Sequence, residues 1–166
     1  MPDIASAAAR QQVKKERLED LAARPGFLIR RLHQIHVALF YEECGAYGLT
    51  PVQYSVLTSL QGEELDQKRL AESVGIDRAT TTEVLRRLDK AGWIERRKCR
   101  VDGRRQVACL TQTGETLLAT VEESARRAHE RTIEPLTKAE QDRFVRYMNK
   151  IVSAKNEHGR ASLKFP

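Results

Sequence analysis

The chain has 166 residues, of which 40% are hydrophobic, 5% aromatic and 31% charged, and its formal net charge is +6. This length suits one domain, or two small layers that share a core. The charged, aromatic-poor composition favours a mainly helical protein with solvated faces. No segment approaches the ~18 apolar residues that span a membrane, and the polar N-terminal residues do not resemble a signal peptide. We therefore predict a soluble, cytoplasmic protein with no membrane partner.

The N-terminal part is predicted to contain an arm and one long helix. Residues 1–24 are alanine-rich and then charged, so we expect a frayed or helical arm. Pro25 and Gly26 interrupt that pattern, and a helix is predicted from about Phe27 to Cys44. Its apolar side chains recur at helical spacing, as one stripe of Leu28, Leu32, Ile35 and Leu39.

Three shorter helices are predicted next. Thr50-Pro51-Val52-Gln53 reads as a capping box with proline at the first helical position, and this helix runs to about Leu60. Asp66 caps a helix over residues 67–74, which Gly75 can end in the left-handed conformation. Asp77 caps the following helix, which extends to about residue 91. The short link between the last two helices has the spacing of a helix-turn-helix.

A hairpin is predicted directly after these helices. Residues 93–99 and 106–110 read as two strands around Asp102-Gly103, a strong turn signal. A two-residue turn there pairs Cys99 with Gln106. A helix-turn-helix followed by a hairpin defines a winged helix, so we place a winged helix-turn-helix lobe, of α+β character, at residues 50–111.

The positive charge is concentrated in this lobe. Residues 78–105 contain ten basic side chains and four acidic ones, so they carry the entire excess of +6, whereas the rest of the chain is neutral. Charged surfaces are usually balanced by acids, and an unbalanced basic stretch on a helix and hairpin favours a nucleic-acid partner.

Two more amphipathic helices are predicted in residues 112–155. The first has the apolar stripe Leu118, Val121, Ala125 and Ala128 and ends before Pro135. The second opens with a capping box at Thr137 and Glu140 and has Phe144, Met148 and Ile151 on one face. A winged lobe does not need these stripes for its own core. We therefore predict that residues 112–155 and the helix within residues 25–49 form a homodimer interface, followed by a tail at residues 156–166.

These features resemble the MarR family of bacterial regulators (multiple antibiotic resistance regulators) from about residue 25 to 154. The most specific element is Asp102-Gly103-Arg104 followed by Leu110-Thr111 and Gly114, which is similar to the family's wing signature. The resemblance implies an obligate dimer shaped like a triangle, in which two winged lobes form the base and the first, fifth and sixth helices form the apex. It also implies a repressor that binds a palindromic operator in double-stranded DNA.

The resemblance and the chemistry of the side chains together suggest the DNA contacts. The family's wing arginine falls on Arg104, which is expected to enter the minor groove, and Asp102 is expected to orient a nearby arginine. Arg86 is placed to read guanine in the major groove and Arg78 to contact phosphate. Short hydroxyls near the helix N-terminus are expected to meet phosphates and base edges, and these belong to Thr80, Thr81 and Thr82.

Some of these residues have simpler roles as alternatives. Asp77 and Thr81 can cap the helix with no contact to DNA, and for Asp77 we prefer this interpretation. Three further basic side chains are expected to supply general electrostatics only, because strand residues alternate faces: Arg97, Lys98 and Arg105.

The resemblance also implies a small anionic aromatic effector that releases the protein from DNA. The side chains suited to hold a carboxylate or a phenol are Arg30, Arg31, His33, His36, Phe40 and Tyr54. Part of the N-terminal sequence is similar to members that control aromatic-acid catabolism, so related phenols and CoA thioesters are also candidates. In the alternative interpretation, His33 and His36 pack in the dimer interface.

Other functions have weaker support. A peroxide sensor of this family has a cysteine near the start of the first helix, but no cysteine precedes Cys44, and Cys99 and Cys109 are out of register. His33 and His36 lack a third metal ligand, so neither a metal nor a cofactor is predicted. No motif of a hydrolase or a phosphate loop occurs, so we do not expect an enzyme. An architectural protein that binds DNA without sensing a ligand stays open.

Overall fold

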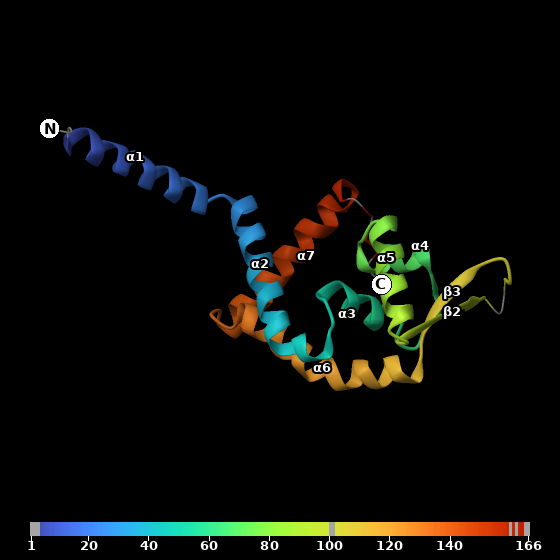
Figure 1. Ribbon diagram of the computed structural model, residues 1–166. Helices are drawn as coiled ribbons and strands as arrows, with labels where there is room; N and C mark the ends of the chain where they lie inside the picture. Colours follow the sequence, from blue (N-terminus) through green and yellow to red (C-terminus); the bar gives the residue numbers. More distant parts are fainter. Residues whose placement is uncertain (1–3, 100–101, 160, 162, 165–166) are drawn as a thin grey trace. The chain divides into compact units, whose positions relative to one another are not determined.

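The computed structural model describes residues 4–99, 102–159, 161 and 163–164. Contacts divide the chain into two units, residues 1–38 and 39–166. Helix α1 (Ile4–Ala22) and most of helix α2 (Pro25–Cys44) belong to the first unit, and the boundary falls within α2. Helix α2 begins at Pro25, two residues before the predicted start, because proline is well suited to the first helical position. Figure 1 shows the course of the chain.

The three helices of the lobe follow the predicted caps. They are α3 (Pro51–Ser59), α4 (Gln67–Val74) and α5 (Arg78–Lys90), with the short 3-10 turn η1 (Gly45–Tyr47) ahead of them. The capping box at α3 is complete, since Gln53 N donates to Thr50 Oγ1 at 3.2 Å and Thr50 N donates to Gln53 Oε1 at 2.9 Å. Gly75 adopts a φ of 71° between α4 and α5, the left-handed conformation that the turn requires.

The sheet has one strand more than the sequence predicts. Strand β1 (Leu65–Asp66) joins the hairpin strands β2 (Ile94–Lys98) and β3 (Gln106–Leu110) in an antiparallel sheet with the order β1-β3-β2. A strand of two residues is too short to leave an alternating pattern, which is why the sequence does not indicate it. Figure 1 shows the β2–β3 hairpin extending away from α4 and α5.

The predicted register of the hairpin is wrong by one residue, because Lys98 and not Cys99 pairs with Gln106. The reason lies in the turn. Asp102 Oδ1 accepts a hydrogen bond from Arg104 N at 3.1 Å, and Asp102 O accepts one from Arg105 N at 3.0 Å. This Asx turn makes Asp102 the first residue of the turn. Gly103 is not in the left-handed region that a two-residue Asp-Gly turn demands.

Helices α6 (Gln112–Ile133) and α7 (Lys138–Lys155) complete the predicted elements. Thr111 caps α6 through Gly114 N at 3.1 Å, and its hydroxyl donates to Gly92 O at 2.7 Å. The start of α6 therefore contacts the residues that directly precede β2. A Cβ atom at Gly114 would lie 2.0 Å from Trp93 O, so only glycine fits there.

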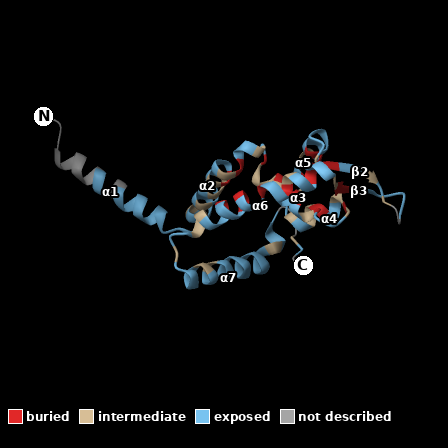
Figure 2. Cartoon of the chain, turned by 90° about the horizontal axis from the view of Figure 1, so that it is seen from below, coloured by how far each residue is buried: buried red, intermediate tan, exposed pale blue. Residues whose placement is uncertain are grey.

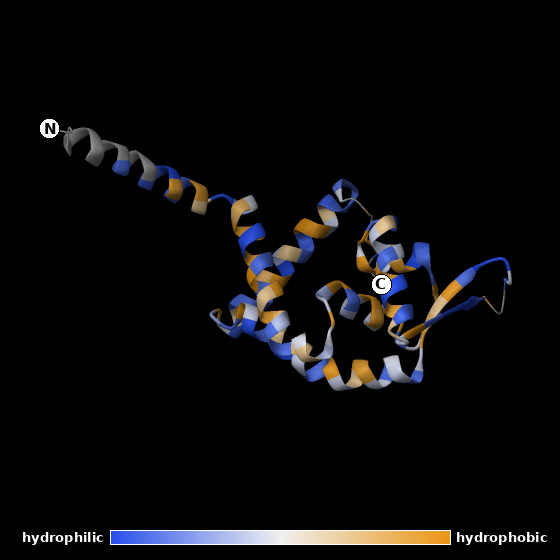
Figure 3. Ribbon diagram, viewed as in Figure 1, coloured by the Kyte–Doolittle hydropathy of each residue, from blue (hydrophilic) through white to orange (hydrophobic). Residues whose placement is uncertain are grey.

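The core of the second unit is a single apolar cluster (Figure 2). It takes leucines and valines from α3, α4, α5 and α6, together with Leu65 and Ile94 from the sheet. Helix α7 contributes no buried residue. Most of its large hydrophobic side chains are exposed, including Tyr147 at 62% and Ile151 at 60%, and Figure 3 shows apolar patches along α7. The mainly helical winged-helix fold class is confirmed, and the use of α7 in a dimer stays a prediction.

The C-terminal tail packs against the helix-turn-helix, which the sequence does not indicate. After the 3-10 turn η2 (Asn156–His158), Asn156 Nδ2 donates to Leu163 O at 2.6 Å and Leu163 N donates to Asn156 Oδ1 at 2.8 Å. The Leu163 side chain then lies against Gly75, and Lys164 N donates to Glu72 O at 2.8 Å.

We predict that Gly114→Ala lowers the stability of the protein, because the new methyl group collides with the backbone of Trp93 and not with a flexible side chain. The expected loss is about 1–3 kcal/mol, measured by urea denaturation. Gly45→Ala is the matched control, since a Cβ atom at Gly45 meets nothing within 4 Å. Equal stability of both variants would show that α6 does not depend on this close approach.

Candidate nucleic-acid interface

Helix α5 separates its inward and outward faces clearly. Thr81, Leu85 and Leu88 are buried, whereas the predicted DNA contacts Arg78, Thr80, Thr82 and Arg86 are exposed. Asp77 caps the helix with both carboxylate oxygens, since Thr80 N donates to Oδ1 at 2.8 Å and Thr80 Oγ1 to Oδ2 at 2.9 Å. The preferred role of Asp77 as a cap therefore agrees with its geometry.

The predicted contact between Thr81 and DNA is corrected by the structure. Thr81 is 0% exposed, and its hydroxyl donates to Asp77 O at 2.8 Å. A buried threonine whose hydroxyl is bonded to the preceding turn has no atom left for DNA. Thr81 therefore stabilises the start of the helix, which is the alternative given for it above.

Thr82 connects the two helices of the helix-turn-helix. Its hydroxyl donates to Arg78 O at 2.8 Å and accepts from Gln67 Nε2 at 2.6 Å, and Gln67 also donates to Arg78 O at 3.2 Å. Gln67 is the first residue of α4. These bonds hold the start of α4 against the start of α5, which fixes the angle at which α5 presents its outward face.

Arg86 is already held by a carboxylate in the free protein. Glu83 accepts from Arg86 Nε and Nη2, both at 2.8 Å, and from Arg87 Nε at 2.7 Å. These two guanidinium groups lower the pKa of Glu83 to about 2. The predicted guanine reader is therefore oriented by a neighbour that the sequence analysis did not single out.

The basic side chains of the wing have different environments. Arg104, at the tip, is exposed, and its backbone is fixed by Asp102. Asp102 therefore acts on the wing arginine through the main chain. Arg97 instead forms an ion pair with Glu64, and its Nη1 lies 3.4 Å from Glu95. The hydrogen bond that Arg97 donates to Glu64 raises the pKa of Arg97.

Arg105 is also part of the wing's attachment. It forms an ion pair with Asp66, whose other oxygen accepts from Arg69 N at 2.9 Å as the cap of α4. The expectation that Arg97 and Arg105 supply only general electrostatics is therefore wrong, because Glu64, directly before β1, and Asp66, in β1, engage them. Lys98 is exposed, and its role in general electrostatics stays a prediction.

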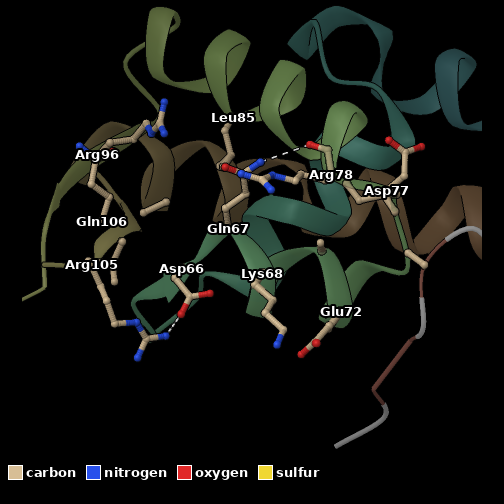
Figure 4. Close-up of a pocket in the computed structure, with 15 residues that line it drawn as sticks. Asp66, Gln67, Lys68, Glu72, Asp77, Arg78, Leu85, Arg96, Arg105 and Gln106 are labelled. Carbon is tan, nitrogen blue, oxygen red and sulfur yellow. Dashed lines mark hydrogen bonds and ion pairs between the residues drawn. The ribbon is translucent and has the colours of Figure 1, made fainter. Parts of the chain in front are cut away.

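A groove of about 720 Å³ lies between the helix-turn-helix and the base of the wing. Figure 4 shows Arg78 from α5, Lys68 from α4 and Arg96 from β2 around it, with Asp66 paired to Arg105 at one side. Lys68 and Arg96 are exposed cations beside the predicted phosphate contact Arg78. Sequence reasoning missed Lys68 because its neighbour in the groove, β1, was not predicted.

The predicted effector residues fall in both units. In the second unit, Phe40 is 1% exposed and its ring lies 5.8 Å from that of Tyr54, so the structure brings these two together in the core. In the first unit, Arg30 lies 5.3 Å from the centre of the Phe27 ring and donates to Gln34 at 3.2 Å. Arg31 and His33 are exposed and His36 is partly buried.

Two of the three thiols are poorly placed for redox sensing. Cys44 and Cys109 are buried, and burial raises the pKa of both, so they stay protonated near neutral pH. Cys109 lies opposite Glu95 in the sheet, out of register with Cys99 as predicted. Within the described residues, no three His, Cys, Asp or Glu side chains are grouped as metal ligands. None of the helices in the described ranges has the length and apolarity to cross a bilayer.

A helix-turn-helix joined to a small antiparallel wing, with its basic side chains on the outward helix face and hairpin, defines a winged helix DNA-binding protein. A family model described as the MarR family matches residues 47–105. The PcaV transcriptional regulator of Streptomyces coelicolor, solved in complex with its natural ligand, is 34% identical, with a TM-score of 0.72 over 81% of this chain and 95% of PcaV. The chain belongs to the MarR family of transcriptional regulators.

Two further relatives have related functions. The transcriptional regulator HosA of Escherichia coli O157:H7 is 29% identical over 126 residues, which cover 75% of this chain and 92% of HosA. BpsR of Bordetella bronchiseptica, whose DNA binding is regulated by 6-hydroxynicotinic acid, is 27% identical, with a TM-score of 0.74 over 78% of this chain and 94% of BpsR.

We predict that thiol reactivity separates Cys99 from the two buried cysteines. At pH 7 the folded protein should react quickly with a disulfide reagent at Cys99, which is partly exposed, and slowly at Cys44 and Cys109. Absorbance titration in buffer and in urea measures this. Rapid reaction of all three thiols in the folded protein would revive the redox alternative.

Proposed function

We propose that this protein is a homodimeric repressor that binds a palindromic operator and is released by a small aromatic carboxylate, or by a related phenol or CoA thioester. The observation that carries the DNA part is the placement of its positive charge. The excess of +6 in residues 78–105 falls on α5 and on the wing, two elements of one lobe, from which the wing projects (Figure 1).

The two elements suit two grooves of DNA. The outward face of α5 fits the major groove, where Arg86 can reach guanine. Arg104 at the exposed tip of the wing suits the minor groove, which concentrates negative potential where it is narrow. Exposed cations around the 720 Å³ groove, Lys68, Arg78 and Arg96, suit the phosphates between these grooves.

The dimer is supported by the apolar face of α7. Tyr147, Met148, Ile151 and Val152 are all exposed in the single chain, and helices with such a stripe usually bury it against a partner. Two equivalent lobes on one face of DNA require half-sites centred about one helical turn apart, hence a palindrome.

The effector class is supported by relatives and by residue chemistry. BpsR responds to 6-hydroxynicotinic acid, an aromatic acid, and the present chain has Arg30, Arg31, His33, His36 and Tyr54 as groups that bind carboxylates or phenols. Phe40 is buried behind Tyr54, so the partly exposed Tyr54 is the aromatic side chain of this pair that can meet a ring. The architectural alternative needs none of these groups, so ligand binding separates the two functions.

We predict that Arg104→Ala and Arg105→Ala have different effects, although the residues are adjacent. Arg104→Ala should weaken DNA binding. The slope of log affinity against log salt concentration should also become shallower, by about one ionic contact per lobe. Arg105→Ala should instead lower thermal stability, because it removes the partner of Asp66. Fluorescence anisotropy over a range of salt concentrations measures the first effect. Identical salt slopes for wild type and Arg104→Ala would remove the wing tip from the interface.

The effector is tested with a thermal-shift screen of hydroxynicotinates, hydroxybenzoates, hydroxycinnamates and their CoA thioesters. A compound at one hundred times its dissociation constant should stabilise the protein by about 2.7 kcal/mol, and it should also release DNA in an anisotropy assay. A protein that binds a duplex specifically but responds to no member of the screen would contradict the aromatic effector while leaving the DNA function intact.

A further inference from the structure

Glu83 lies on α5, the proposed recognition helix, on the face that points away from the core. Thr81, Leu85 and Leu88 form the buried face of α5. Helical spacing places Glu83 opposite them and between Arg86 and Arg87. A carboxylate therefore lies within the surface that is proposed to face DNA, where its charge opposes binding to a polyanion.

The contacts of Glu83 make it a clamp for both arginines. Arg86 donates twice to it, through Nε and Nη2 at 2.8 Å each, and Arg87 donates through Nε at 2.7 Å. Exposed ion pairs of this kind contribute little to folding stability, so stability does not explain the arrangement. The two guanidinium groups hold the pKa of Glu83 at about 2, and the clamp therefore persists throughout the physiological pH range.

The clamp affects phosphate contacts and base contacts differently. To bind a phosphate of random DNA through the Nε edge, Arg86 must release two hydrogen bonds, and the phosphate must approach the Glu83 carboxylate. A guanidinium group has five N–H donors, of which Glu83 accepts two from Arg86. The remaining donors include those on the Nη1–Nη2 edge, which can bind the O6 and N7 atoms of guanine. Unlike a phosphate, these atoms have no formal charge, so the Glu83 carboxylate repels them less.

We propose that Glu83 is a specificity-determining residue, which disfavours phosphate contacts by Arg86 and Arg87 and orients Arg86 toward a base edge. The proposal rests on the proposed function as a sequence-specific DNA-binding protein. Arg86 then contributes to the discrimination between sequences, and Glu83 lowers affinity for DNA in general.

The test compares Glu83→Gln with wild type on two probes, a duplex selected from a random pool by the wild-type protein and a duplex of random sequence. Glu83→Gln should bind the random duplex more tightly. Its slope of log affinity against log salt concentration should be steeper by up to about two ionic contacts per lobe. The ratio of the two affinities should fall about tenfold. The matched control is Asp89→Asn, which removes the same charge from an exposed position on the same helix and should leave the ratio unchanged.

A second set of variants identifies the route of the effect. In an Arg86→Ala, Arg87→Ala background, Glu83→Gln should no longer change the ratio. Equal ratios for Glu83→Gln and Asp89→Asn would overturn the proposal. So would a loss of affinity for the selected duplex alone, because Glu83 would then read a cytosine itself. If the wild type prefers no sequence, the proposed function fails, which is evident before any variant is measured, and the role of Glu83 fails with it.

Discussion

The arrangement of this lobe depends on the carboxylate of Asp66. One of its oxygens caps α4 by accepting a hydrogen bond from Arg69 N at 2.9 Å. The other pairs with Arg105, which directly precedes strand β3 of the wing. The backbone of Asp66 also pairs with Val107 in the sheet. One side chain, only 14% exposed, thus joins the helix-turn-helix to the hairpin. Because the proposed function requires α5 and the wing to reach two grooves together, their relative placement determines whether both can bind.

The basic side chains of the lobe include two groups with different environments. Arg97 and Arg105 are engaged by Glu64 and Asp66, so they attach the wing to β1. Arg78 and Arg104 are exposed on the helix start and the wing tip, where DNA is proposed to lie. Net charge alone indicates a polyanionic partner, and the ion pairs with Glu64 and Asp66 indicate which of the wing's cations serve its attachment instead.

Much of the lobe was predictable because its signals are local. The caps at Thr50, Asp66 and Asp77 lie within three residues of the groups they bind, so sequence spacing determines them. The wing signature also has a physical reason, since Gly114 lies too close to Trp93 O for any side chain. The features that escaped prediction depend on contacts distant in sequence, such as β1 against β3 and the Arg97–Glu64 pair. The hairpin register was missed because Asp102 forms an Asx turn that competes with the expected one.

The central claim is that the recognition helix and the wing read two grooves as one unit held by Asp66. Hydroxyl-radical footprinting of the selected duplex with wild type and Asp66→Asn tests it most directly, because asparagine retains the helix cap but loses the charge that binds Arg105. The account predicts two protected half-sites with flanking minor-groove protection for wild type, and selective loss of the flanking protection for Asp66→Asn. Equal loss at all positions, or an unchanged footprint, would contradict it.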